Sequence, residues 1–252
     1  MSDRPMHTVP GLYARLEALY AEGEQAIAEG RYEDAVARFS EGIALDDHFR
    51  QRWITQYAQR AFALHRLGRW EEALADYEAA LKMGEPPPNQ AQYHFHRGMV
   101  LERLDRPEEA ATAYGEAIAM MPEQPGPRHL RGQLLAEKLG RPAEALLDFD
   151  AFLAAGYENP AVRVLRAWCL LLAGRPAEAL QDLARVPDPA AWTCYLRAWA
   201  CAVTGDVDGC LGAIAETLAQ DGAYRPYFLE HPDYAAARAD PRFEGVLSGQ
   251  PS

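Results

Sequence analysis

The side chains in this sequence of 252 residues that could carry chemistry include seven histidines, four cysteines and four serines. His94 and His96 are two residues apart, which separates them around a helix and does not place both on one face, as paired metal ligands would require. Ser2, Ser248 and Ser252 lie near the chain ends, where a rigid nucleophilic site is not expected. These residues therefore predict neither a metal site nor a serine nucleophile.

The four cysteines are Cys169, Cys194, Cys201 and Cys210. Cys194 and Cys201 are seven residues apart and would share one face of a helix, which is the simplest arrangement for a pair of thiols. The sequence has no Cys-x-x-Cys motif and no phosphate-binding glycine loop. We interpret the cysteines as small buried apolar residues and predict a protein that is not an enzyme and has no catalytic residues, metal ion or cofactor.

The charge of the chain restricts its partners. Asp and Glu number 37 against 25 for Lys and Arg, which gives a formal net charge of −12. Nucleic acids and anionic membranes bind clustered Lys and Arg, and no segment here is strongly basic. The polar N-terminus and the shortness of the longest apolar run, 167–173, argue against a signal peptide and a membrane span. We expect a cytoplasmic protein with a protein or peptide partner, and no nucleic acid or membrane.

A short phrase recurs along the chain. Copies begin at Gly30, Gly68, Asp105, Gly140 and Gly174, with a weaker copy at Gly205, in steps of 38, 37, 35, 34 and 31 residues. In this phrase a glycine can end one helix in a left-handed conformation, and a proline or aromatic residue followed by acidic residues begins the next. Each copy therefore predicts a helix, a tight turn and a second helix.

Small and large residues recur at fixed distances from this turn. The small ones in the second helix are Ala35, Ala73, Ala110, Ala145, Ala179 and Cys210, and the large ones are Phe39, Tyr77, Tyr114, Phe149, Leu183 and Ile214. A spacing of four places both on one helical face. The preceding helices have small residues at Gly23, Ala61, Gly98, Ala167 and Ala198. The fourth unit has Gln133 in this slot, with Gly132 beside it as a substitute that would put this hairpin slightly out of phase.

These motifs resemble the tetratricopeptide repeat, whose unit is 34 residues, over nearly the whole chain. The resemblance implies an all-α, right-handed superhelical solenoid of about six hairpins, as in bacterial arrays. We expect a single domain over 1–252 with repeats at 16–49, 50–88, 89–123, 124–158, 159–189 and 190–222, a cap at 223–248 and flexible tails at 1–10 and 249–252. The predicted turns between repeats include Asp46-Asp47, 85–88, Met121-Pro122, Asn159-Pro160 and 187–189. A longer helix is expected from about Phe49 to Leu67, and a shortened second helix in the fifth unit.

In this family the first helices line a concave surface. The resemblance therefore implies the candidate peptide-binding residues Tyr20, Phe62, His65, Phe95, Met99, Leu130, Leu134, Val164, Trp168, Leu171, Tyr195 and Trp199. The C-terminal half of this surface is apolar and aromatic, and would suit an amphipathic helix or an extended peptide. The basic clamp that some members use for the acidic tails of heat-shock chaperones is not matched in the first two hairpins. His94 and His129 fall in one repeat slot, with a packing role.

Three functional hypotheses follow. The first is a protein-binding adaptor or scaffold whose groove receives a partner segment. The second is a structural module whose groove is filled by its own C-terminal segment, 224–230, or by the closing helix. The third is self-association through the aromatic stripe, because large exposed apolar patches are uncommon on monomers. A monomer and a homodimer are both left open.

Overall fold

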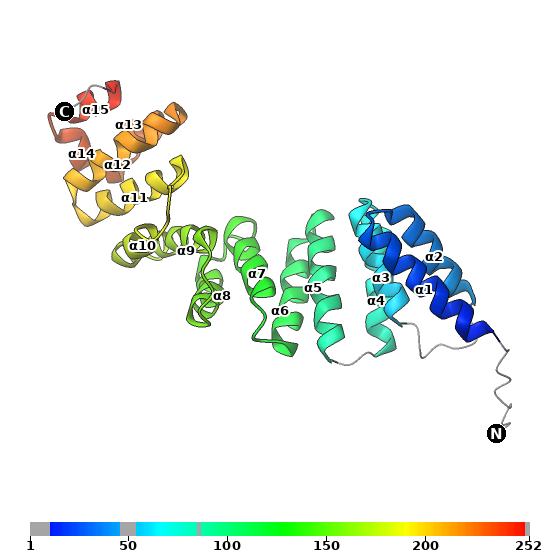
Figure 1. The fold of residues 1–252 in the computed structure, drawn as a ribbon. Helices are drawn as coiled ribbons and strands as arrows, with labels where there is room; N and C mark the ends of the chain where they lie inside the picture. The colour runs from blue at the N-terminus through cyan, green and yellow to red at the C-terminus, as the bar shows by residue number, and fades with distance from the viewer. Residues whose placement is uncertain (1–10, 46–53, 85–86, 250–252) are drawn as a thin grey trace. The chain divides into compact units, whose positions relative to one another are not determined.

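The structure, a computed structural model, describes residues 11–45, 54–84 and 87–249, and all regular elements in these ranges are helices (Figure 1). The predicted turn at Asp46-Asp47 and the predicted helix start at Phe49 lie outside the described residues. The chain divides into two compact units, Met1–Pro127 (unit 1) and Arg128–Ser252 (unit 2), which are treated separately below. The all-α fold class predicted from the repeat is confirmed.

Unit 1 consists of consecutive helical hairpins. Its helices are α1 (Leu12–Ala28), α2 (Tyr32–Leu45), α3 (Ile54–Arg66), α4 (Trp70–Met83), α5 (Pro87–Arg103) and α6 (Pro107–Met120), followed by the first residues of α7 (Pro125–Glu137). Each helix from α1 to α5 packs against the next one along the chain. This is the arrangement of a repeat protein, in which neighbouring hairpins share one apolar interface.

Unit 2 continues the same pattern and ends in short helices. It holds the rest of α7, then α8 (Pro142–Ala154), α9 (Pro160–Leu172), α10 (Pro176–Leu183), α11 (Ala191–Thr204), α12 (Val207–Gln220), η1 (Gly222–Tyr224), α13 (Arg225–Glu230), η2 (Pro232–Tyr234), α14 (Ala235–Ala239) and α15 (Phe243–Ser248). Helix α10 has only 8 residues, in agreement with the shortened fifth unit. Elements η1, α14 and α15 all contact α12.

The recurring phrase forms the turns that the sequence predicts. Gly68 and Gly174 adopt positive φ angles of 77° and 69°, a conformation in which a side chain is rarely accommodated. Asp105 takes the equivalent position without glycine, at a φ of 55°. Prolines occupy the first turn of α6, α8, α9 and α10, where the missing backbone N–H costs nothing.

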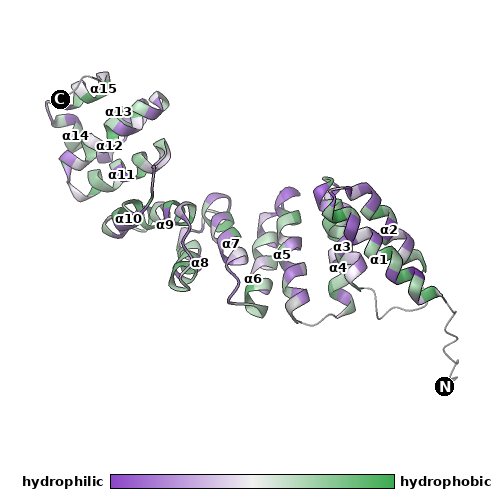
Figure 2. Cartoon of the chain, viewed as in Figure 1, coloured by the Kyte–Doolittle hydropathy of each residue, from purple (hydrophilic) through white to green (hydrophobic). Residues whose placement is uncertain are grey.

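The small and large residues that recur after each turn form the cores of both units. All the small ones are fully buried, and the large ones are at most 4% exposed. Figure 2 shows hydrophobic and hydrophilic residues on the same helices, as expected when one face of a helix packs inward and the other is polar. The predicted core pattern is confirmed.

The fourth turn contains one extra residue, which shifts the register of α7. In the third hairpin, the Arg106 N–H donates to the carbonyl of Leu101, five residues back, at 2.9 Å. In the fourth, the Arg141 N–H donates to Leu135, six residues back, at 2.8 Å. Gly132 consequently takes the small-residue slot that the sequence frame gives to Gln133.

Two predicted boundaries need correction. Pro87 and Pro88 were expected in the turn between repeats, but α4 ends at Met83 and Pro87 is the first residue of α5. Asn159 and Pro160 likewise start a helix: the Asn159 side chain accepts a hydrogen bond from the Ala161 N–H at 2.9 Å and caps α9. A proline at a first helical position loses no hydrogen bond, so these prolines begin helices as well as separating them.

Arginines in the first helices pair with acidic residues in the second helices of the same hairpins. Arg60 forms a bidentate pair with Asp76 at 2.7 Å, and Arg131 forms one with Asp148 at 2.6 and 2.7 Å. Arg166 contacts Asp182 at 2.6 Å. All three aspartates are buried, so these pairs lie within the packed interface and help to fix the two helices of a hairpin against each other.

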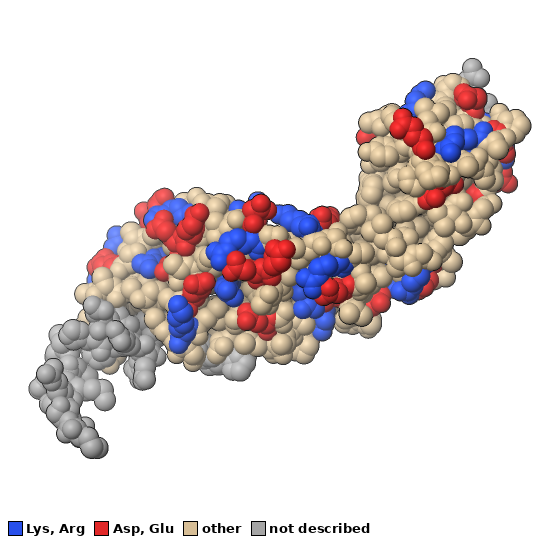
Figure 3. Space-filling model, turned by 180° about the vertical axis from the view of Figure 1, so that it is seen from behind, with Lys and Arg blue, Asp and Glu red and all other residues tan. Residues whose placement is uncertain are grey.

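A second set of pairs lies at the surface of the turns. The arginine of the phrase contacts an acidic residue three positions later, as in Arg69 with Glu72 at 2.7 Å and Arg141 with Glu144 at 2.5 Å. Over unit 1 in Figure 3, basic side chains lie beside acidic ones and do not gather into a patch of one sign. Exposed pairs of this kind contribute little to stability.

Candidate aromatic binding site

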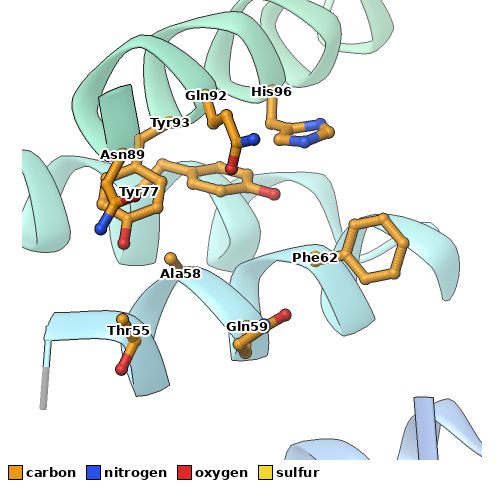
Figure 4. A pocket seen from close by; sticks show the side chains of 9 residues that line it. All are labelled: Thr55, Ala58, Gln59, Phe62, Tyr77, Asn89, Gln92, Tyr93 and His96. Atoms are coloured by element: carbon orange, nitrogen blue, oxygen red, sulfur yellow. The ribbon is translucent and has the colours of Figure 1, made fainter. Parts of the chain in front are cut away.

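The candidate residues of unit 1 lie on the first helices of their hairpins, as the repeat frame requires. Tyr20 is on α1, Phe62 and His65 are on α3, and Phe95 and Met99 are on α5, and all five are half-buried. Of these, Phe62 lines a cavity of about 210 Å³. The cavity walls come from α3, α4 and α5, and are Thr55, Ala58, Gln59, Phe62, Tyr77, Asn89, Gln92, Tyr93 and His96 (Figure 4).

Two buried polar atoms at this small cavity have no hydrogen-bond partner among the described residues, the hydroxyl of Tyr77 and Nδ1 of His96. The two rings are stacked, with centroids 6.0 Å apart and an interplanar angle of 14°. Burial raises the pKa of Tyr77 and lowers the pKa of His96 to about 4, with a smaller contribution from His65 to the second shift. Both groups are therefore neutral at physiological pH.

The extra residue in the fourth turn changes the assignment of the candidates on α7. Leu134 was expected on the concave face, but it is 2% exposed and belongs to the core. Leu130 is half-buried, and it now occupies the slot of His96 in the third hairpin. His129 was expected to match His94, whereas the corrected register matches it to Phe95. Gln133, which is half-buried, thus takes the slot that the sequence frame gives to Leu134.

The candidates on α9 and α11 lie in two environments. Leu171 is buried in the core of unit 2, and Val164 is half-buried and packs against that core. Trp168, Tyr195 and Trp199 line a second cavity, of about 490 Å³. The sequence therefore predicts three of the residues at this cavity, which we call the aromatic pocket.

The aromatic pocket is lined by Trp168, Trp192, Tyr195, Trp199, Asp221, Ala223, Tyr224 and Tyr227. Trp192, Tyr195 and Trp199 lie at steps of three and four residues along α11, which places them on one helical face. Trp168 comes from α9, and the other four residues come from the chain after α12. Six of the eight lining residues are aromatic, so the walls are almost entirely formed by ring surfaces.

The rings form a continuous set of contacts. Trp168 meets Trp192 edge to face at 6.2 Å between centroids, and Trp192 stacks on Tyr195 at 5.4 Å. Tyr195 contacts Tyr224 at 5.3 Å and Tyr227 at 6.0 Å. Aromatic pairs at these separations stabilise one another, which fixes the positions of the walls.

The C-terminal segment forms one wall of the aromatic pocket and is itself anchored. Phe228 is buried and contacts Tyr195 at 5.9 Å between centroids. The Trp199 indole N–H donates to Asp233 at 2.7 Å. Phe228 also packs with the buried Tyr234 in the apolar cluster around α12. The sequence suggests that segment 224–230 could fill the groove; Tyr224 and Phe228 of this segment contact Tyr195, and Tyr224 and Tyr227 line the cavity.

The one charged residue in the lining is Asp221. Its Oδ1 accepts a hydrogen bond from the Ala223 N–H at 2.9 Å, which caps η1 and fixes the carboxylate. None of the described lining residues is Lys or Arg, and no ion pair to Asp221 is formed within the described part of the chain. Sequence reasoning missed Asp221 because it lies directly after the last repeat helix, α12, outside the repeating positions, although an Asp-Gly turn at that point is a recognisable signal.

The chain offers little for covalent or metal chemistry in the ranges described. All four cysteines are buried, and burial raises the pKa of Cys169 and Cys201 to about 11 and that of Cys210 to about 12. Within residues 11–45, 54–84 and 87–249, no group of three or more His, Cys, Asp or Glu side chains is placed to hold a metal ion. No helix in these ranges is long and apolar enough to cross a membrane.

Family models place the chain among known proteins. Residues 59–126 and 134–193 match one model of the tetratricopeptide repeat, and residues 191–216 match a second one. The first model alone covers half of the sequence, and the chain therefore belongs to the tetratricopeptide repeat family. Its repeats make it a protein–protein interaction module in the general sense of that family.

Solved structures show the same fold at low sequence identity. The structure titled as a functional characterisation of Pseudomonas aeruginosa pilF aligns with a TM-score of 0.61 at 19% identity, over 91% of this chain and 99% of that one. YrrB, described as a TPR protein with an unusual peptide-binding site, gives 0.56 at 19% identity over 76% and 87%. MamA 41-end from Desulfovibrio magneticus RS-1 gives 0.57 at 16% identity over 68% and 93%. A comparison with curated proteins gave no match.

Proposed function

We propose that this protein is a non-catalytic adaptor or scaffold that binds a segment of another protein in the aromatic pocket of unit 2. The observation that carries the proposal is the exposure of large aromatic rings at the edge of a cavity of about 490 Å³. Trp192 is 37% exposed and Tyr227 is 56% exposed, although each could bury far more surface against a partner. Exposed aromatic groups beside a cavity are typical of a site where a ligand is bound.

The pocket is also well suited to bind without rearranging. Trp199 is held by its hydrogen bond to Asp233, and Tyr195 is in contact with Tyr224, Tyr227 and Phe228. Because these contacts fix the walls before a partner arrives, little conformational entropy is lost on binding. The YrrB structure, a fold relative with a peptide-binding site, is consistent with such a role for a chain of this family.

The competing function is a module whose groove is occupied by its own chain. The contacts of Tyr224 and Phe228 with Tyr195 favour this reading for the part of the groove that they cover. The same segment leaves the aromatic pocket unfilled, with Tyr227 more than half exposed. We therefore infer that the C-terminal segment forms one wall of the aromatic pocket and that a partner segment binds inside the pocket.

A selection experiment tests the proposal. The full chain is used to select binders from a random peptide library, and their affinities are then measured by fluorescence anisotropy. We expect a variant with both Trp192→Ala and Tyr227→Ala to bind the selected peptides at least about tenfold more weakly, because aromatic anchors dominate interface energies. The matched control is Leu147→Ala, which removes an exposed apolar side chain of α8 that does not line the pocket.

The outcomes separate the competing functions. Circular dichroism establishes that both variants are folded before binding is compared. Equal affinity of the native chain and the pocket variant would refute the proposed site. A native dimer that becomes a monomer in the pocket variant, measured by light scattering, would instead support self-association through the aromatic rings.

A further inference from the structure

We propose that the aromatic pocket recognises an arginine side chain, so that the partner segment carries an arginine as its anchor. The proposal rests on the proposed function, since it specifies what the same site binds. Three features support it: the ring surfaces, the carboxylate of Asp221 and the absence of an internal cation at the described lining residues.

The ring surfaces are suited to a flat cation. The face of an aromatic ring is electronegative and attracts a cation that lies within about 6 Å of its centroid. In the aromatic pocket, neighbouring ring centroids from Trp168 through Trp192 and Tyr195 to Tyr224 are 5.3 to 6.2 Å apart. Because these rings contact one another, a cation must lie on their cavity side, where neighbouring rings are close enough for it to contact more than one. The indoles of tryptophan give the strongest attraction.

Asp221 supplies a counter-charge in a fixed orientation. Its Oδ1 already accepts the Ala223 N–H, so the carboxylate cannot rotate freely. The remaining lone pairs on its two oxygens are available to accept hydrogen bonds, and a guanidinium can use both oxygens through its planar fork of donors. A lysine ammonium would make a single contact and is more strongly hydrated, so the combination of ring faces and carboxylate favours arginine.

Elsewhere, two half-buried aromatic rings lie next to arginines of the chain itself. In unit 1, Arg66 lies over Tyr32 at 5.1 Å, and Arg103 lies over Trp70 at 5.9 Å from the ring centroid. Neither Lys nor Arg is among the described residues that line the aromatic pocket, which has six rings and a carboxylate. The formal net charge of −12 also favours a basic partner. The pocket thus combines the ring faces and the anion that a cation site requires.

The test compares two peptides that differ only in charge. The probes are acetyl-Ala-Leu-Arg-Leu-Ala-amide and the same peptide with neutral citrulline in place of arginine, titrated into the full chain with tryptophan fluorescence as the signal. We expect the arginine peptide to bind at least about tenfold more tightly. In Asp221→Asn, which keeps an oxygen to accept the Ala223 N–H, this preference should fall to less than about threefold.

A control variant separates a local effect from a general loss of negative charge. Glu178→Gln removes an exposed carboxylate of α10 that pairs with Arg175 and does not line the pocket. It should retain the full preference for arginine, and the preference of the native chain should decrease as salt is added.

Equal affinity for the two peptides would overturn the arginine proposal. So would the absence of binding of the arginine peptide up to about 1 mM. The arginine proposal would likewise be overturned if the Asp221→Asn variant kept the preference for the arginine peptide and the Glu178→Gln variant lost it. In each case the proposed function is judged separately, by the binding of the library peptides. If these peptides still need Trp192 and Tyr227, the proposed function stands without the arginine proposal. If they do not, both proposals fail.

Discussion

A Cβ atom placed on Gly132 would lie 2.6 Å from Cε1 of Phe149, which is closer than real side chains approach one another. The same 2.6 Å separates a Cβ on Gly98 from Cε1 of Tyr114. Gly132 therefore has the role of Gly98 in its own hairpin, and the extra residue of the fourth turn lies C-terminal to it.

Substitution of Gly132 by valine tests this register. Overpacking a filled core costs about 1–3 kcal/mol, so we expect Gly132→Val to lower the free energy of unfolding by about 3 kcal/mol in urea titrations. Gln133→Val places the same residue one position further along α7, on the half-buried concave side, and should change the stability by less than about 1 kcal/mol. If Gln133→Val lowers the free energy of unfolding more than Gly132→Val does, Gln133 and not Gly132 occupies the small-residue slot.

Most of the fold could be predicted from the sequence because the repeat encodes it locally. The turn phrase marks each reversal of the chain, and buried positions such as Ala110 and Tyr114 follow it at fixed spacing. The sequence already offers Gly132 as the substitute for Gln133, but the extra residue itself is not marked, because a one-residue insertion leaves the phrase intact. The hydrogen bond from Arg141 to Leu135 and the contact between Gly132 and Phe149 locate it.

The candidate site could be predicted only in part. Trp168, Tyr195 and Trp199 follow from the repeat frame, since their helices are regular. Asp221 and Tyr227 lie after the last repeat helix, α12, where no periodicity specifies which way the chain turns. The packing of Phe228 and Tyr234 against α12 determines their position, and such a long-range contact leaves no local signal.

The buried ion pair between Arg131 and Asp148 should be important for stability. Asp148 is almost fully buried, so removing its charge leaves the guanidinium partly desolvated and without its partner. We expect Asp148→Asn to lower the free energy of unfolding by about 2–4 kcal/mol. Glu144→Gln, which removes an exposed carboxylate that pairs with Arg141, should have almost no effect in the same urea titration. Similar effects of the two substitutions would contradict the importance of the buried pair.

Stability should fall in mildly acidic solution because of His96. Burial lowers its pKa from 6.5 to about 4, so the unfolded chain binds a proton in this interval that the folded chain does not. The contribution of neutral His96 to the free energy of unfolding is therefore complete above pH 6.5 and is lost as the pH falls towards 4. Between about pH 7 and about pH 5, the native chain should lose about 1–2 kcal/mol more stability than His96→Phe, measured by urea unfolding.

The phenylalanine variant is a suitable reference because it retains a ring next to Tyr77 but cannot bind a proton. Burial also lowers the pKa values of His65 and His129, and this effect is common to both proteins, apart from the smaller interaction between His65 and His96. Parallel stability curves for the two proteins over this pH range would show that His96 is not held neutral in the folded state.

The cysteines should be unreactive in the folded protein. Their thiols are buried and their pKa values are raised, so the thiolate that attacks a reagent is scarce at about pH 8. We expect a disulfide reagent such as Ellman's reagent to modify the native chain slowly, and to modify all four thiols rapidly in urea. Rapid modification of Cys194 or Cys201 without denaturant would indicate a thiol site that this account does not include.

A crystal structure of the full chain with a peptide selected for tight binding would show whether the aromatic pocket binds a partner segment. We expect peptide atoms in contact with Trp168, Trp192 and Tyr227, with an arginine guanidinium at Asp221. A peptide bound at any other surface, with the aromatic pocket empty, would contradict the proposed function.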